Sequence, residues 1–238
     1  MSMLLLAVDT SGKNGSLALA RAMPGQSEID VLGVVPLDGG AFSAQLVPQI
    51  AALLEKHGHR KIELDALVVA SGPGSFTGLR VGLAAIKALA EVLQKPIVAI
   101  SLLEAIAWSS KTHVATPGRI LALLDAGRHD VYVGDYELGP QLRMQSERLL
   151  GRGEFLAEAT GAEGGRSTLA VVVTPDAMLA EMVRAAGIQC VLIEYPNSGV
   201  IARLGWEHLQ RGQTVRPEEL EANYIRHSDA EIFSKPAR

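Results

Sequence analysis

Short apolar runs separated by turn residues alternate with stretches of helical periodicity along the chain. In the first part, the pattern predicts strands at 4–8, 16–21 and 31–35, a helix at 43–57, a strand at 67–70, a helix at 76–94 and a strand at 96–100. Asn14-Gly15 is a strong hairpin signal between the first two strands. This order predicts a β-meander followed by a strand–helix–strand unit with parallel strands.

The second part of the chain repeats this order. It predicts strands at 121–124, 131–136 and 169–173, a helix at 177–186 and a strand at 190–193. Two copies of one β-meander and strand–helix–strand plan indicate an internal duplication. We therefore expect an α/β fold of two lobes, each a mixed sheet with helices, facing one another across a cleft.

The helix predicted at 76–94 is apolar on nearly all sides. Its charged positions, Arg80, Lys87 and Glu91, form one narrow stripe. A helix that covers one face of a sheet buries one side only, so this pattern predicts burial on a second side as well. Two candidates for that second side stay open at this point: the helix at 43–57, or another protein.

Composition narrows the class of function. The chain has 238 residues, of which 48% are hydrophobic, and this suffices for one large domain or two lobes of about 100 residues each. The formal net charge of −4 argues against a strongly cationic surface, so any RNA contact would be local or supplied by a partner. Cys190 is the only cysteine, which excludes an internal disulfide and fits a reducing compartment.

The apolar runs also bear on location. None approaches about 18 residues, and the run at 3–8 has no basic flank and ends at Asp9. We therefore expect neither a membrane span nor a signal peptide, and hence a soluble cytoplasmic protein.

Asp9-Thr10-Ser11 stands at the end of the first predicted strand, before a turn that contains glycine. Hydroxyls and amides at such a place can surround a phosphate, and the carboxylate can hold a metal–nucleotide complex or activate a nucleophile. Alternatively, Asp9 bonds the amides of the turn, as aspartates do where strands end. The residues alone favour this second interpretation.

The glycine-rich stretch at 72–78 precedes a predicted helix, and helix N-termini offer unpaired amides that attract anions. However, it matches neither the Walker A pattern nor the dinucleotide-binding pattern. A tight turn with Ser75 or Thr77 capping the helix is the simpler interpretation.

No group of residues has the spacing of a metal or nucleophile site. His57 and His59 are two residues apart, and the chain contains no His-x-x-x-His motif. It also lacks the Gly-x-Ser-x-Gly motif of a nucleophile elbow. We expect no bound metal and no catalytic residues.

These motifs, in this order, resemble the TsaB (YeaZ) family. The matching pieces are Val8-Asp9-Thr10-Ser11, the stretch at 71–82, Lys87 with Leu89-Ala90, Leu124-Asp125-Ala126 with Val131-Tyr132, and Asn223-Tyr224-Ile225-Arg226. The stretch at 71–82, Ser-Gly-Pro-Gly-Ser-Phe-Thr-Gly-Leu-Arg-Val-Gly, is the most specific, and the stretch at 137–189 matches weakly. The resemblance covers essentially the whole chain.

The resemblance implies a fold similar to that of actin, Hsp70 and sugar kinases, in agreement with the two predicted lobes. It also implies a degenerate paralogue of TsaD, the enzyme that transfers threonylcarbamoyl to adenosine 37 of tRNAs reading ANN codons. The chain would be a non-catalytic scaffold or activator that binds TsaD, helps recruit the ATPase TsaE and meets tRNA only through the complex. It would hold no cofactor stably, although the complex uses ATP, and it would form a homodimer when alone.

The resemblance also implies sites. A partner interface would be built from the two helices of the first lobe, at Ser43, Leu46, Val47, Ile50, Arg80, Leu83, Ala84 and Lys87. Residues Asp9, Thr10 and Ser11 would form a vestigial phosphate or nucleotide loop. TsaD-like proteins carry a His-x-x-x-His metal motif near the first helix, whereas the stretch at 39–43 contains no histidine, and Phe42 stands where many family members have one.

The expected domains are an N-terminal lobe over 1–103 that carries the partner-binding helices, a second lobe over 104–215, and a tail over 216–238 that packs back on the body. One alternative is an ATP-dependent kinase or phosphotransferase of the same fold. It would need a glycine-rich adenosine loop in the second lobe, and the stretch at 172–176 has no glycine. A metallopeptidase is a further alternative, against which the missing metal ligands count.

Overall fold

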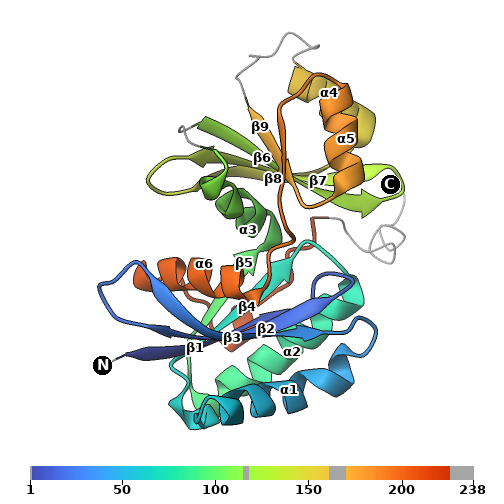
Figure 1. Cartoon of the computed structure of the whole chain (residues 1–238). Coiled ribbons are helices and arrows are strands. Elements are labelled where there is room, and N and C mark those ends of the chain that lie inside the picture. The colour runs from blue at the N-terminus through green and yellow to red at the C-terminus, as the bar shows by residue number, and fades with distance from the viewer. Residues whose placement is uncertain (1, 115–117, 161–169, 226–238) are drawn as a thin grey trace, which may run out of the picture. The chain divides into compact units, whose positions relative to one another are not determined.

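The computed structural model describes residues 2–114, 118–160 and 170–225 (Figure 1). The chain divides into two compact units, of which the first comprises residues 1–105 and 195–222 and the second comprises the remaining described residues. Each unit is a five-stranded mixed sheet with helices. The predicted α/β class with two such lobes is therefore confirmed.

The first unit is built on a sheet of strand order β3-β2-β1-β4-β5. Its strands are β1 (Met3–Asp9), β2 (Gly15–Ala22), β3 (Ile29–Leu37), β4 (Ala66–Gly72) and β5 (Ile97–Ser101). The first three strands pair antiparallel, whereas β1, β4 and β5 pair parallel. The predicted meander and strand–helix–strand unit are both present.

Helices cover both faces of this sheet, which is why β1 and β4 are buried along nearly their whole length. Helices α1 (Phe42–Lys56) and α2 (Phe76–Leu93) lie side by side against one face, and α6 (Ser198–Gln210) lies on the other (Figure 1). Short 3-10 turns occur at η1 (Lys61–Glu63) and η3 (Pro217–Glu219). The boundary between the units falls within α3 (Leu102–Ser109), which precedes η2 (Ser110–Thr112).

The second unit repeats the plan with the strand order β10-β9-β6-β7-β8. Its strands are β6 (Gly118–Gly127), β7 (Asp130–Leu138), β8 (Arg143–Gly151), β9 (Val171–Thr174) and β10 (Cys190–Leu192). Helices α4 (Arg152–Thr160) and α5 (Ala177–Ala185) pack against the sheet and contribute to its core. Read in the opposite direction, this order is β8-β7-β6-β9-β10, which matches β3-β2-β1-β4-β5 of the first unit strand for strand. An internal duplication requires such a match.

The division of the chain differs from the predicted boundaries at its C-terminal end. Helix α6 lies in the range 104–215 that was assigned to the second lobe, but it packs on the sheet of the first unit, where the Trp206 indole donates to the carbonyl oxygen of Gln26 at 2.8 Å. Leu220, predicted in a separate tail over 216–238, is buried in the core of the first unit. The second unit is thus formed by residues 106–194 together with the described residues 223–225, and the part of the predicted tail from 226 to 238 lies outside the described residues.

Among the described residues, no helix combines the length and the apolar character that crossing a membrane requires.

Candidate functional site

The turn after β1 is buried and internally hydrogen-bonded. Asp9 is only 1% exposed, and its Oδ1 accepts hydrogen bonds from the amide of Ser11 at 2.8 Å and from the Ser11 hydroxyl at 2.6 Å. The hydroxyl of Thr10 donates to the carbonyl oxygen of Gly78 at 2.7 Å. The polar groups that would serve a phosphate or a metal are thus already used within the chain.

Burial raises the pKa of the Asp9 carboxyl above its ordinary value, and the two hydrogen bonds from Ser11 oppose that shift. A carboxyl with these surroundings favours its neutral form more than a solvated aspartate does. This electrostatic setting is unfavourable for holding a magnesium–nucleotide complex, because oxygen ligands of magnesium are usually ionised carboxylates or phosphates.

The glycines of the motif at 71–82 are explained by close contact with this turn. A β-carbon on Gly74 would lie 2.3 Å from the carbonyl oxygen of Ser11, and one on Gly78 would lie 2.1 Å from that of Thr10. A β-carbon on Gly82 would meet the Thr10 hydroxyl oxygen at 2.3 Å. Any larger residue at these positions would push the helix away from β1, so the motif serves packing.

Ser75 begins α2 as its N-cap. Its hydroxyl accepts a hydrogen bond from the amide of Gly78 at 3.3 Å, and its own amide donates to the carbonyl oxygen of Ser11 at 2.7 Å. The predicted capped turn is confirmed, with Ser75 rather than Thr77 as the cap. The cap also ties the start of α2 to the end of β1.

Tyr195 completes the surroundings of the turn, and sequence reasoning missed it. A β-carbon on Gly12 would lie 3.0 Å from the hydroxyl oxygen of Tyr195. Burial, followed by the charge of Asp9, raises the pKa of the Tyr195 phenol, while hydrogen bonding with Ser11 opposes the shift. No local signal in the sequence links Tyr195 to residues 9–12, because the contact joins distant parts of the chain.

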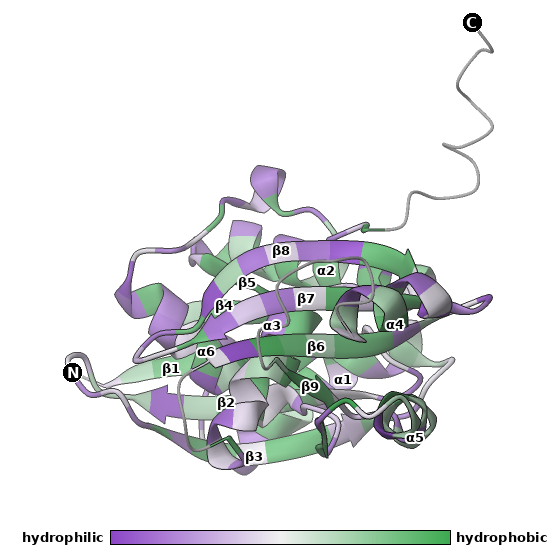
Figure 2. Ribbon diagram, turned by 90° about the horizontal axis from the view of Figure 1, so that it is seen from above, coloured by the Kyte–Doolittle hydropathy of each residue, from purple (hydrophilic) through white to green (hydrophobic). Residues whose placement is uncertain are grey.

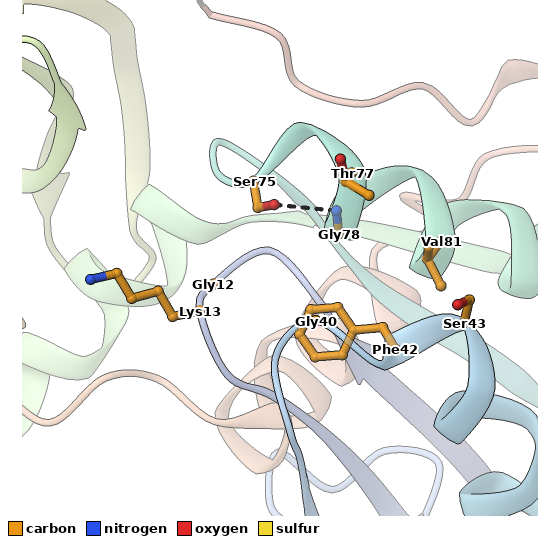
Figure 3. A pocket seen from close by; sticks show the side chains of 9 residues that line it. All are labelled: Gly12, Lys13, Gly40, Phe42, Ser43, Ser75, Thr77, Gly78 and Val81. Atoms are coloured by element: carbon orange, nitrogen blue, oxygen red, sulfur yellow. Dashed lines mark hydrogen bonds between the residues drawn. The ribbon is translucent and has the colours of Figure 1, made fainter.

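A pocket of about 250 Å³ opens beside the turn, at the first residues of α1 and α2 (Figure 3). It is lined by Gly12, Lys13, Gly40, Phe42, Ser43, Ser75, Thr77, Gly78 and Val81. Phe42 and Val81 give it apolar walls, and the amine of Lys13 points away from it (Figure 3). With no carboxylate, histidine or cysteine in the lining, the pocket offers no acid–base pair for catalysis.

The eight predicted interface residues do not share one surface. Leu46, Ile50 and Leu83 are 1%, 5% and 6% exposed and belong to the core of the first unit. Their predicted place in a partner interface is therefore corrected, because apolar character suits a core and an interface equally well. Of the others, Ser43, Val47, Arg80 and Ala84 are exposed and Lys87 is half-buried.

The exposed side of α2 carries residues at intervals of four, which lie about one turn apart along the helix and form a stripe. The α2 stripe consists of Phe76, Arg80, Ala84, Ala88 and Val92. The guanidinium carbon of Arg80 lies 3.6 Å from the centre of the Phe76 ring, so the two side chains stack at one end of the stripe. Helix α1 covers part of the second apolar side of α2, and the residues of the α2 stripe are exposed in the part of the chain that the structure describes.

Among the residues that the structure describes, no group of three or more histidine, cysteine, aspartate or glutamate side chains lies close enough to hold a metal ion. That the whole chain binds no metal stays a prediction.

Comparisons with known proteins identify the family. Residues 26–151, more than half of the chain, match the family model described as TsaD, tRNA N6-adenosine threonylcarbamoyltransferase. The chain is 33% identical to the tRNA threonylcarbamoyladenosine biosynthesis protein TsaB of Bacillus subtilis over 57% of this chain and 56% of that protein. It is 30% identical to an uncharacterized protein of Mycobacterium leprae over 95% of this chain, and it spans 56% of the length of that relative.

A solved structure agrees with these sequence matches. The structure of YeaZ from Pseudomonas aeruginosa superposes with a TM-score of 0.72 at 24% identity, covering 93% of this chain and 99% of that one. This likeness supports the two-lobed fold. The chain belongs to the TsaD family, and it is similar to TsaB of Bacillus subtilis in sequence and to YeaZ of Pseudomonas aeruginosa in fold.

Proposed function

We propose that this chain is a non-catalytic subunit in the formation of N6-threonylcarbamoyladenosine at position 37 of tRNAs that read ANN codons. In this role it binds a TsaD-type transferase, helps recruit the ATPase TsaE in the cytoplasm and meets tRNA only through the assembled complex. It holds no cofactor itself, although the complex uses ATP, and it forms a homodimer when the transferase is absent. The family assignment supports its place in threonylcarbamoyladenosine biosynthesis.

The observation that carries the proposal is the exposed face formed by α1 and α2. The centre of the α2 stripe consists of Ala84 and Ala88, whose small side chains let a partner helix approach closely, and Val92 is 75% exposed at its end. On α1, Val47 is 64% exposed, and the exposed Ala44 and Ala51 lie about one helical turn before and after it. Two adjacent helices with small apolar outer faces favour a helical partner.

The β1–β2 turn supports the absence of catalysis. A kinase of this fold would need a solvated, ionised aspartate at the end of β1, whereas Asp9 is buried and bonded to Ser11. This geometry counts against the kinase alternative and favours a role through binding.

The substitution Ala84→Glu tests the proposed interface. Ala84 is exposed, so the fold should survive, as circular dichroism and a melting curve would show. A carboxylate buried without a partner at the centre of an interface is very costly, so binding to the organism's own TsaD-type protein and self-association should both be lost. The matched control is Ala177→Glu, an exposed alanine at the start of α5. A folded Ala84→Glu chain that still binds the transferase would place the interface elsewhere.

A further inference from the structure

The pocket at the first residues of α1 and α2 has an apolar wall that the core of the first unit holds in place. The Phe42 ring is 7% exposed and lies between two glycines. A β-carbon on Gly15 would lie 2.9 Å from its Cε1, and one on Gly78 would lie 3.4 Å from its Cε2. Val81 lines the pocket from α2 and packs against the same core. The shape of this wall is therefore fixed before any partner binds.

The rest of the lining is polar but directs no charge into the pocket. Ser43 and Thr77 contribute exposed hydroxyl groups, and the Ser75 hydroxyl already accepts a hydrogen bond from the amide of Gly78. The amine of Lys13 points away (Figure 3). A charged group in this pocket would lose water without gaining an ionic partner. The lining therefore favours an uncharged occupant.

The size of the pocket favours a single side chain. Its volume is about 250 Å³, whereas pockets for small ligands and cofactors usually have about 300–1,000 Å³. The pocket also adjoins the exposed face of α1 and α2. Ser43 lies about one turn before the exposed Val47 on α1, and Val81 lies about one turn before Ala84 of the α2 stripe.

We propose that this pocket receives one uncharged aliphatic or aromatic side chain from a helix of the TsaD-type partner, and that this side chain anchors the partner on α1 and α2. The inference rests on the proposed function and names the place on that face where binding is strongest. Binding energy concentrates in a few side chains that fill pockets. Ala84 and Ala88 let a helix approach closely but bury little area themselves, so a filled pocket at the end of the α2 stripe supplies affinity that they lack.

Filling the pocket from within this chain is the first test. Ser43→Leu places a larger side chain in the lining at an exposed position, so the fold should survive, as circular dichroism and a melting curve would show. Its affinity for the organism's own TsaD-type protein should fall by at least about tenfold. Ser27→Leu, at an exposed serine between β2 and β3, is the matched control and should bind as the unsubstituted chain does. Unchanged affinity of a folded Ser43→Leu chain would overturn the proposal.

Nuclear Overhauser effects in the complex distinguish an inserted side chain from a surface that merely lies near the partner. This chain is deuterated except for its phenylalanine rings and valine methyl groups, and the partner is protonated. Because Phe42 is 7% exposed, a partner side chain can come close to its ring only from inside the pocket. We expect contacts from one aliphatic or aromatic partner side chain to both the Phe42 ring and the Val81 methyl groups.

The outcomes separate this inference from the proposed function. A complex that forms without these contacts would overturn the anchor and leave the proposed function intact. Contacts that appear only between two copies of this chain, and not in the complex, would assign the pocket to self-association and overturn the anchor as well. If light scattering showed that no complex with the transferase forms, both proposals would fail.

Discussion

The backbone carbonyl groups of Thr10 and Ser11 lie in close contact with the motif at 71–82, and this contact requires glycine at two positions of the motif. Gly74 and Gly78 are glycines because the carbonyl oxygens of Ser11 and Thr10 lie within 2.3 Å and 2.1 Å of where their β-carbons would be. The sequence alone suggested the turn and its Ser75 cap, because both are local features. It could not suggest these contacts, because they depend on how β1 and α2 approach one another.

Tyr195 marks the limit of residue-level prediction at the candidate site. The turn at 9–11 was recognisable from its position at a strand end, but nothing near Tyr195 in the sequence indicates that its phenol reaches Ser11. Leu83 shows a different limit, since it was assigned to a partner interface and is 6% exposed in the core. An apolar residue in a sequence does not tell whether its own chain or a partner covers it.

The buried carboxyl of Asp9 leads to a prediction about pH. Its pKa is raised in the folded chain, so the folded state binds the proton more tightly than the unfolded state does. Its stabilising contribution is fully present below the unfolded value of 3.8 and is lost as the pH rises through the raised folded value. Asp9→Asn keeps an oxygen for the bonds from Ser11 and cannot ionise, so its melting temperature should exceed that of the unsubstituted chain increasingly as pH rises.

Melting curves from about pH 4 to about pH 8 measure this effect. Asp38→Asn, which removes an exposed carboxyl, is the matched control. If Asp9→Asn and the unsubstituted chain lost the same amount of stability between low and neutral pH, the raised pKa assigned to Asp9 would be refuted.

At the scale of elements, α2 resolves the choice that its sequence pattern left open. Its buried side is formed by Leu79, Leu83, Ile86, Ala90 and Leu93, and it packs on the sheet and on α1. A second side is exposed among the residues that the structure describes and carries the α2 stripe. Helix α1 therefore covers one side of α2. A partner protein on the exposed side stays a proposal.

A pair of substitutions on α2 tests this assignment of sides. Leu83→Ala removes buried methyl groups from the core and should lower the free energy of unfolding by about 2–5 kcal/mol. Val92→Ala, at a side chain that is 75% exposed, should change it by no more than about 0.5 kcal/mol. Denaturant unfolding measures both, and equal effects from the two substitutions would contradict the described orientation of α2.

The pattern did not predict strand β8 or helices α3, α4 and α6. Much of β8 is exposed, and Figure 2 shows it mostly hydrophilic, in contrast to the central, more apolar β6. An edge strand of this kind lacks a clear hydrophobic alternation. Helix α4 has a single fully buried residue, Phe155, so its helical periodicity is weak as well. The central strands β1 and β4 were predicted because burial on both faces gives each of them a continuous apolar run.

At the scale of the whole molecule, the duplication explains why the fold class could be predicted without any single decisive residue. The sheet orders β3-β2-β1-β4-β5 and β8-β7-β6-β9-β10 correspond strand for strand, so both units have the same topology. The return of α6 to the first unit could not be predicted, because a pattern along the chain records the order of elements and not their partners. The Ser16 and Ser198 hydroxyls, 2.8 Å apart and buried, show this return as a contact between distant residues.

The most direct test of the central claim is formation of threonylcarbamoyladenosine in tRNA by purified proteins given ATP, threonine and bicarbonate. This chain alone should form no product. The organism's other proteins of this system should form product efficiently only when the chain is added, and the Ala84→Glu chain should fail to support them. Clear product from this chain without any partner would contradict a non-catalytic role, and full activity of the other proteins without it would contradict its role as a required subunit.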